Sequence, residues 1–377
     1  MKQEKTWLWV FASLLLVAVL GIMALVYRVA PYFRYHSPDT DTFYYDLDIE
    51  KARNLSDGLV KHVPCQGMIV GTSMTENFSA SQAEALFGGS FVKAPLPGCL
   101  YAEQDALIRT ALQANPELKL VIRSMDMYNY EEDSQRLQSN LEAYPGYVRE
   151  DGFLGQVSYL LNRDVFYREV LPMVWDRLQG RAPGMDDFDG YGAWSKTGVT
   201  GREKVLSGRE SFCLDVRQQP LSQESLQRIR ENIQEHVLDV AKQYPDTQFY
   251  CFLPPYSAAW WGELVEKGKL DAQLEAERLV IELLLPQENI HLFSWNTNRT
   301  LTEDLNNYHD TIHYAYWVNE WMLEQMAAGE GTVTRENYLS YLEQEREVYT
   351  ALEYNALFSQ PDSAGTGIPA FFAKEGM

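Results

Sequence analysis

The chain has 377 residues, of which 46% are hydrophobic and 13% aromatic, and its formal net charge at pH 7 is −21. This length and composition are typical of a folded protein with a sizeable core and exclude an intrinsically disordered chain. The strongly acidic balance would repel a phosphate backbone, so we expect no nucleic acid among its partners.

An apolar segment near the N-terminus predicts membrane anchoring. Residues 7–27 contain no charged side chain, and a helix needs about 20 apolar residues to cross a bilayer. The segment exceeds the apolar core of a cleaved signal peptide, which spans about 7–15 residues. We therefore expect a cytoplasmic tail at 1–6, a transmembrane signal anchor at 7–27 and a connector at 28–62. The protein would then be a single-pass cell-membrane protein whose remaining chain is extracytoplasmic.

Strand and helix patterns alternate from residue 63 onward. Short apolar runs bounded by turn residues predict strands at 67–71, 90–94, 118–124, 247–253 and 290–295. Helical periodicity predicts helices at 80–87, 100–114, 222–244, 264–285, 314–326 and 335–357. This alternation favours an α/β fold with a parallel, doubly wound sheet. The predicted domain covers 63–327, and 328–377 would form a C-terminal helix and tail.

The middle of the chain is less regular. Residues 150–178 predict helices with one apolar face, and about 180–220 form an irregular insertion rich in Gly, Asp and Ser. Long loops of this kind are usually functional or disordered. The four cysteines (Cys65, Cys99, Cys213 and Cys251) lack CxxC spacing, which excludes a zinc ribbon and leaves their disulfide pairing open.

A serine follows the first predicted strand. The run Gly71-Thr-Ser73-Met-Thr-Glu-Asn77 places Ser73 just past the carboxyl end of that strand, where α/β sheets position ligands. Gly71 permits a tight turn, and the N–H groups at a following helix start would stabilise an oxyanion. Ser73 is therefore a candidate nucleophile, and the alternative is an ordinary capping or turn serine.

A second motif, NNYHDTIHYAYW at 306–317, contains two histidines and an aspartate. If the segment is helical, His309 and His313 share one face and resemble a zinc-binding pair. If it is a loop, Asp310 and His313 supply the acid and base of a serine hydrolase. A third interpretation makes both histidines ordinary polar loop residues. The two asparagines before His309 are poor helix formers and favour a loop.

Together the two motifs resemble the first and last blocks of the SGNH, or GDSL-like, hydrolases, with Gly71-Thr-Ser73 in place of the usual Gly-Asp-Ser. The pattern is similar to membrane-anchored SGNH-like proteins of bacterial cell envelopes and, distantly, to the D-alanine-transfer protein of teichoic-acid modification. The resemblance covers roughly 63–327. It implies a three-layer, flavodoxin-like parallel sheet behind the N-terminal transmembrane helix.

The resemblance also implies roles for individual residues. Ser73 matches the nucleophile, His313 the base and Asp310 the acid that orients the base. The backbone N–H groups of Ser73 and Gly98 match two donors to the oxyanion, with Gly98 in the block that follows the second strand.

The third block departs from the family pattern. Its usual Gly-x-Asn-Asp is here Ser124-Met-Asp126-Met, so the side-chain amide donor is missing. Asn77 and Asn129 are candidate replacements for that donor. Asp126 and Tyr256, which follow the third and fourth predicted strands, are candidate substrate-binding residues.

These features favour a membrane-anchored, extracytoplasmic serine esterase or O-acyltransferase acting on acyl esters of a cell-envelope polysaccharide or teichoic acid. No metal or organic cofactor is required. The expected partners are the lipid bilayer, an acylated carbohydrate or cell-envelope polymer and, as a further candidate, a membrane-bound acyltransferase. One alternative is a non-catalytic SGNH-fold module for envelope polymer binding or assembly, because the third block is lost. Another is a zinc hydrolase that uses His309 and His313.

Overall fold

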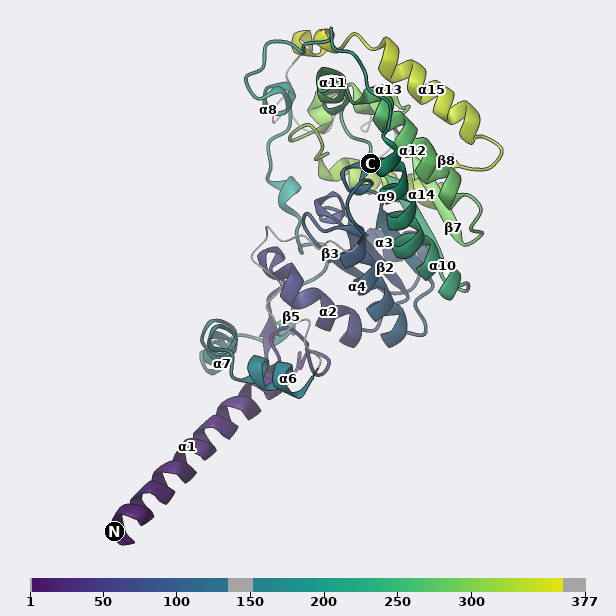
Figure 1. The fold of residues 1–377 in the computed structure, drawn as a ribbon. Coiled ribbons are helices and arrows are strands. Elements are labelled where there is room, and N and C mark those ends of the chain that lie inside the picture. The colour runs from purple at the N-terminus through teal and green to yellow at the C-terminus, as the bar shows by residue number, and fades with distance from the viewer. Residues whose placement is uncertain (1, 135–151, 362–377) are drawn as a thin grey trace. The chain divides into compact units, whose positions relative to one another are not determined.

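The computed structural model describes residues 2–134 and 152–361 (Figure 1). These residues form two compact units. The first contains the described parts of Met1–Pro64 and Ser139–Asp187, and the second those of Cys65–Gln138 and Phe188–Met377. The domain expected at 63–327 is thus interrupted by a segment that packs with the N-terminal connector, and the C-terminal helix belongs with the second unit.

The first unit begins with α1 (Lys2–Val29), which includes the predicted anchor. Residues Lys5–Val29 are long and apolar enough to span a membrane. After it come α2 (Ala52–His62) and a short parallel pair of strands, β1 (Tyr44–Tyr45) and β5 (Gly184–Met185).

The same unit contains α6 (Phe153–Leu160) and a helix that changes its winding midway, from a π-helix at Val165–Val170 to α7 (Leu171–Leu178). Proline at position 172 explains the change, because it lacks an N–H and its ring clashes with the carbonyl four residues earlier. A π-turn relieves this conflict without ending the helix. Of the helical segment predicted at 150–178, residues 150 and 151 lie outside the described residues.

The second unit is built on a six-stranded sheet with the order β3-β2-β4-β6-β7-β8. Five strands are parallel and β8 is antiparallel to β7. Their bounds are β2 (Gly67–Gly71), β3 (Phe91–Pro95), β4 (Leu120–Ser124), β6 (Gln248–Leu253), β7 (Ile290–Ser294) and β8 (Thr332–Val333). Almost every residue of β2, β3 and β4 is buried, as expected for parallel strands covered on both faces.

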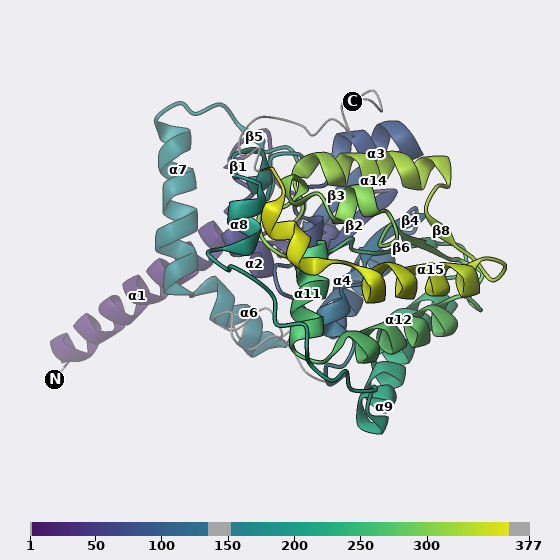
Figure 2. The same cartoon turned by 90° about the horizontal axis from the view of Figure 1, so that it is seen from above.

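Helices cover both faces of this sheet. Figure 2 shows α3 (Ala80–Phe87) and α14 (Tyr316–Ala328) on one side and α4 (Tyr101–Ala114), α9 (Gln223–Ile233) and α12 (Leu270–Leu284) on the other. The remaining helices are α8 (Arg202–Leu206), α10 (Asp239–Gln243), α11 (Ala258–Glu266), α13 (Arg299–Thr302) and α15 (Tyr338–Ala351). The molecule is therefore a mixed α/β protein with a mostly parallel sheet and one N-terminal apolar helix.

Three predicted helices differ from those observed. The helix expected at 222–244 consists of α9, a π-helical stretch at Gln234–Leu238 and α10. The helix expected at 264–285 is two helices, α11 and α12, because Gly268 adopts a left-handed conformation (φ 65°) that ends the first. The helix expected at 335–357 ends at Ala351 and is followed by a 3₁₀ turn at Tyr354–Ser359. The predicted tail beyond residue 361 lies outside the described residues.

The strand order creates a switch point between β2 and β4. From β2 the chain passes to β3 on one side, and from the neighbouring β4 it passes to β6 on the other, so the connections of these two strands leave in opposite directions. In open parallel sheets, ligands bind in the crevice that forms at the carboxyl ends of the strands at such a point.

Candidate active site

The turn after β2 carries Ser73 at the switch point. Glycine is required at position 71, because a Cβ there would lie 2.2 Å from Ser124 Oγ of the neighbouring strand. Thr72 caps the 3₁₀ turn Ser73–Thr75, and its Oγ1 accepts the N–H of Met74 at 3.3 Å. Ser73 itself remains half-buried at the edge of the sheet.

The segment with the two histidines is a closed loop. Tyr308 and Tyr314 form an isolated antiparallel bridge at its base, and the His309 N–H donates to the His313 carbonyl at 2.8 Å. Asp310 Oδ1 accepts the N–H groups of Ile312 and His313 at 2.9 and 2.8 Å. The helical arrangement that a zinc-binding His pair requires is therefore absent.

The two loops bring Ser73, His313 and Asp310 together. Ser73 Oγ lies 2.8 Å from His313 Nε2, and His313 Nδ1 lies 2.7 Å from Asp310 Oδ2. The carboxylate thus fixes the ring so that Nε2 faces the serine hydroxyl, an arrangement that activates serine nucleophiles. All three side chains are partly accessible.

The loops are also tied to each other and to the sheet. The carbonyl of Met74, next to Ser73, accepts hydrogen bonds from Tyr314 Oη and Asn319 Nδ2, both at 3.1 Å. On the other side, Ser257 Oγ donates to the Thr311 carbonyl at 2.7 Å. These contacts fix the loop that carries Ser73 and the loop that carries His313, and so fix the distance between the two side chains.

Burial and the hydrogen bond between His313 and Asp310 have opposite effects on the pKa values of both side chains. Burial disfavours the charged form of His313, but its hydrogen bond to the Asp310 carboxylate and that negative charge outweigh burial and raise the histidine pKa. Burial likewise acts to raise the pKa of Asp310, yet the hydrogen bonds from His313 and Ile312 bring it below its ordinary value. Asp310 therefore stabilises the imidazolium that would form when His313 accepts a proton.

Asp126 lies beneath the site, not in its opening. Its carboxylate accepts three hydroxyl hydrogen bonds, from Ser124 at 2.6 Å, Thr72 at 2.7 Å and Tyr256 at 3.3 Å. Burial raises its pKa, against the effect of these hydrogen bonds. Asp126 is 3% exposed and Tyr256 is fully buried. The structure places both as supports of the Ser73 turn and not as the substrate-lining residues that we expected.

Two backbone N–H groups follow the carboxyl ends of the paired strands β2 and β3. Gly98 follows β3, is exposed and has a left-handed conformation (φ 64°) that favours glycine. Among the described residues, neither the N–H of Gly98 nor that of Ser73 has a hydrogen-bond acceptor. Both are therefore available to a negatively charged oxygen.

The two asparagines proposed as replacement donors have other contacts. Asn129 Nδ2 donates to the Cys99 carbonyl at 2.9 Å, and Asn77 Oδ1 accepts the Ser195 N–H at 2.9 Å. Asn129 thus holds the turn that presents Gly98, and Asn77 holds a segment that passes over the site. In this structure, each asparagine therefore positions a neighbouring segment through its side-chain amide.

That segment, residues 188–200, belongs to the irregular insertion, and we call it the strap. Asp189 fastens one end by accepting the N–H and Oγ of Ser81 at the start of α3. Trp194 Nε1 donates to the carboxylate of Glu76, and its ring meets the His313 ring edge-on with centroids 5.6 Å apart. The strap therefore covers one side of the His313 imidazole.

His309 anchors the strap. Its Nε2 lies 2.6 Å from Ser195 Oγ, and its Nδ1 lies 3.0 Å from the Val199 carbonyl. A Cβ at Gly198 would lie 2.7 Å from the His309 ring, so glycine is needed for this close approach. Burial lowers the histidine pKa, which favours the neutral ring. Both ring nitrogens of His309 thus form hydrogen bonds with the strap. Neither is left to bind a metal together with His313.

Sequence reasoning did not identify the strap residues or Lys93. Lys93 is fully buried on β3, and its ammonium donates to the carbonyls of Glu76 at 2.6 Å and Phe78 at 3.0 Å, which fixes the chain after Ser73. A lysine inside an otherwise apolar strand was a usable signal, because buried ammonium groups need specific partners. The strap offered only its length and a single tryptophan.

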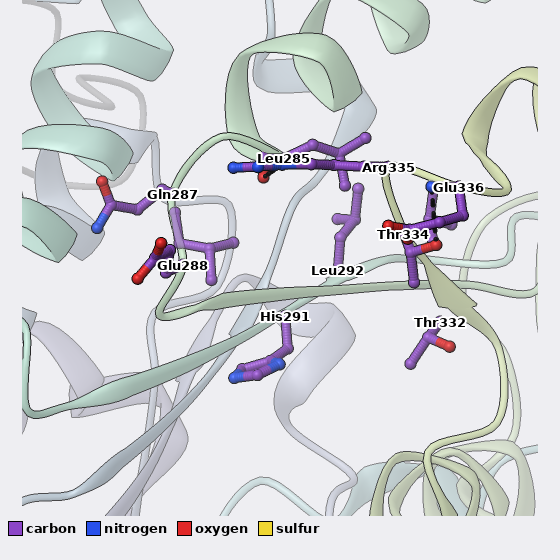
Figure 3. A pocket seen from close by; sticks show the side chains of 11 residues that line it. Leu285, Gln287, Glu288, His291, Leu292, Thr332, Thr334, Arg335 and Glu336 are labelled. Atoms are coloured by element: carbon purple, nitrogen blue, oxygen red, sulfur yellow. Dashed lines mark hydrogen bonds between the residues drawn. The ribbon is translucent and has the colours of Figure 1, made fainter.

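Other features lie apart from this site. Among the residues that the structure describes, no group of three His, Cys, Asp or Glu side chains gathers as metal ligands would, and all four cysteines are free thiols. A cavity of about 290 Å³ lies between the amino end of β7 and β8 (Figure 3). The Arg335 guanidinium beside it donates to the carbonyls of Leu285 and Pro286.

No family model, no curated protein and no solved structure matches the chain. The function must therefore be inferred from the geometry around Ser73, His313 and Asp310. That geometry combines an accessible serine hydroxyl, an imidazole with a raised pKa and a carboxylate hydrogen-bonded to it, at one edge of a mostly parallel sheet.

Proposed function

We propose that the protein is a membrane-anchored serine esterase or O-acyltransferase of SGNH type, with its catalytic unit outside the cytoplasm. One observation carries the proposal, namely the unbroken relay of hydrogen bonds from Ser73 Oγ through His313 to Asp310. Neutral imidazole at 2.8 Å from a serine hydroxyl is within the distance at which general bases accept protons.

The chemistry follows from these positions. His313 Nε2 takes the proton of Ser73 as Oγ attacks the ester carbonyl, and a tetrahedral intermediate with a negative oxygen forms. His313 then gives that proton to the leaving alcohol as the carbon–oxygen bond breaks and an acyl-serine remains. Water or a sugar hydroxyl, deprotonated by His313, then attacks the acyl carbon. His313 returns that proton to Ser73 Oγ as the bond between Oγ and the acyl carbon breaks, which releases the acid or the new ester.

The oxyanion in this mechanism is stabilised by backbone donors. The N–H groups of Ser73 and Gly98 are free of other acceptors among the described residues and lie at adjoining strand ends. Two fixed N–H dipoles stabilise a developing negative charge without reorganising. The buried Asp126 carboxylate is surrounded by hydroxyl donors, which supports a positioning role for it.

The topology supports the SGNH assignment. Numbered along the chain, the five parallel strands of the sheet have the order 2-1-3-4-5, which is that of flavodoxin-like doubly wound folds. Ser73 follows the first of these strands, Gly98 the second and the Asp310–His313 loop the fifth. This is the arrangement that the resemblance implies.

The resemblance and the anchor together support the proposed substrate class. A helix able to span a bilayer favours a substrate at the cell surface. We assign acyl esters of a cell-envelope polysaccharide or teichoic acid, with a membrane-bound acyltransferase as a candidate partner. The mechanism needs no cofactor.

A fluorophosphonate probe tests the proposal, because it forms a stable bond only with an activated serine. We expect the full-length protein to be labelled and Ser73→Ala to lose the label. Ser340→Ala is the matched control, since Ser340 is an exposed serine on α15 far along the chain from the site. Labelling of Ser340→Ala should equal that of the wild type.

Two results would contradict the proposal. A folded wild type that takes no label would leave the non-catalytic polymer-binding alternative, and a label that persists in Ser73→Ala would locate the nucleophile elsewhere. Circular dichroism of each variant separates loss of folding from loss of reactivity.

A further inference from the structure

The N-terminal unit exposes a row of apolar side chains on the helix that runs from Val165 through α7. We call this row the stripe. Its members are Tyr167, Leu171, Trp175 and Leu178, with exposures of 61%, 36%, 62% and 73%. Steps of four, four and three residues place them on one face of the helix. The buried residues of the helix, Val165 and Val170, hold its other side in the unit.

The charges beside the stripe differ from those of the chain as a whole. Residues 163–181 contain four arginines and three acidic residues, whereas the chain has a net charge of −21. Each of these acidic side chains has a basic partner: Asp164 pairs with Arg168, Glu169 with Lys51 and Asp176 with Arg181. The helix therefore presents apolar groups and arginines without an unpaired carboxylate.

The helix that carries the stripe packs at its N-terminal part against α1 within the same unit. Both α6 and the π-helix Val165–Val170 pack against α1. Along α1, Leu14 and Val17 are 65% and 67% exposed, and full burial begins only at Val26. Because the uncharged run of α1 ends at Tyr27, the packed part is the outer end of the apolar span.

The direction of α7 also matters. Figures 1 and 2 show α6 and α7 beside the C-terminal end of α1, with α7 crossing the direction of α1 instead of continuing it. A helix that crosses the direction of a transmembrane helix near the end of its apolar span can lie along the membrane surface. Helices in this plane combine Trp, Phe and Leu on one face with arginines beside them.

We propose that the stripe, together with Phe153 and Leu154 of α6, inserts into the outer interface of the bilayer that α1 spans. Phe153 and Leu154 are 80% and 77% exposed and extend the apolar surface beside α1. Trp175 and Tyr167 are the residue types that favour the boundary between headgroups and acyl chains, and arginine side chains reach from it to the phosphates. The unit thus has a second membrane contact besides the anchor.

This inference assumes that α1 spans the bilayer and is independent of the chemistry at Ser73. Its occupant is lipid, because the helix that carries the stripe packs through its π-helical part against the end of the apolar span of α1. A partner protein on the same surface is the competing occupant, and the experiment must separate the two.

The experiment uses full-length protein in phosphatidylcholine liposomes. All variants carry Cys213→Ser, which removes the one exposed native thiol. An environment-sensitive fluorophore is then attached at Leu178→Cys, and quenching by lipids with a nitroxide on the acyl chain is measured. Leu15→Cys in α1 is the membrane-embedded control, and Leu339→Cys, at a 60% exposed site on α15, is the water-exposed control.

We expect the label at position 178 to be quenched about threefold or more above that at position 339, since interfacial helices insert about 5–10 Å into the bilayer. The label at position 15 should be quenched at least as strongly as that at position 178. Quenching at 178 equal to that at 339 would overturn the inference, whatever the result at 15. A label at 178 that native membranes shield from aqueous iodide, but that lipid nitroxides do not quench, would also overturn it and assign the stripe to a protein.

Discussion

Two serine–histidine hydrogen bonds occur a few ångströms from the same tryptophan, and they differ in what surrounds them. Ser73 lies 2.8 Å from His313, and Ser195 lies 2.6 Å from His309. The Trp194 ring contacts both imidazoles, with centroid distances of 5.6 and 4.9 Å. The shorter hydrogen bond belongs to the pair that we do not assign to chemistry.

Three differences distinguish the pairs. His313 Nδ1 contacts the Asp310 carboxylate, which raises the pKa of this histidine. His309 Nδ1 contacts the Val199 carbonyl instead, and burial lowers the pKa of that histidine. Ser195 is 2% exposed and its Oγ also accepts the Tyr316 N–H, whereas Ser73 is accessible and its own N–H is free among the described residues. A serine–histidine distance therefore does not identify a nucleophile, because activation also needs the carboxylate, access and oxyanion donors.

The largest expected effect separates the two histidines. His313→Gln should lower hydrolysis of p-nitrophenyl acetate by about four orders of magnitude or more, because loss of the base removes the whole relay. His309→Gln, which removes a histidine four residues away in the same loop, is the matched control and should keep most of the activity. Equal losses in the two variants would erase the distinction between the pairs.

Asp310→Asn tests the carboxylate. The rate should fall by about 10³–10⁴-fold, since the imidazole loses its orientation and its counter-charge. Activity rises as pH increases through the pKa of His313, because the base must be neutral. Asp310 raises this pKa, so the remaining activity of Asp310→Asn should begin at lower pH than that of the wild type. A pH–rate profile checks both effects, and an acid limb that moves to higher pH would contradict the assignment.

Ser195→Ala tests the second pair directly. The strap loses the hydroxyl that joins His309 to the Tyr316 N–H, and an unsatisfied buried group costs about 1–3 kcal/mol of stability. We expect the rate to fall by about tenfold or less, because misplacement of the strap acts on His313 only through Trp194. Urea unfolding and probe labelling measure the two effects. Loss of labelling as complete as in Ser73→Ala would give Ser195 a chemical role.

Gly198→Ala should have the smallest effect on the reaction. Its Cβ would lie 2.7 Å from the His309 ring, and such overpacking costs about 1–3 kcal/mol of unfolding free energy. The rate should change only a few-fold. Gly152→Ala is the matched control, because no atom lies within 4 Å of a Cβ at that position. If both variants unfold at the same urea concentration, the strap does not pack as described.

Much of the fold followed from local patterns. The strands predicted at 67–71, 90–94, 118–124, 247–253 and 290–295 each overlap an observed strand, since buried parallel strands are short apolar runs that are visible in any window. The two-residue strands β1, β5 and β8 were not predicted, because they have too few residues to form a pattern. The return of residues 152–187 to the N-terminal unit also had no local sign.

The site, like the fold, has residues that the sequence could identify and residues that it could not. Residue types and order proposed Ser73, Asp310 and His313, and the structure brings these three within hydrogen-bond distance. The places of Asp126, Asn77 and Asn129 depend on contacts between distant segments, so the sequence suggested their chemistry but not what they touch. Glu76 and the strap were not identified for the same reason, because their contacts also join distant segments.

By itself, the amino-acid sequence determined what depends on neighbours along the chain: the apolar run of α1, the strands and the Asp310 turn that precedes His313. The resemblance proposed His313 as the partner of Ser73, but only the tertiary structure decided what surrounds each of the two histidines in this loop. The side chains of His309 and His313 have the same chemistry. Their environments differ because burial, a carboxylate and a strap from more than 100 residues away act through space.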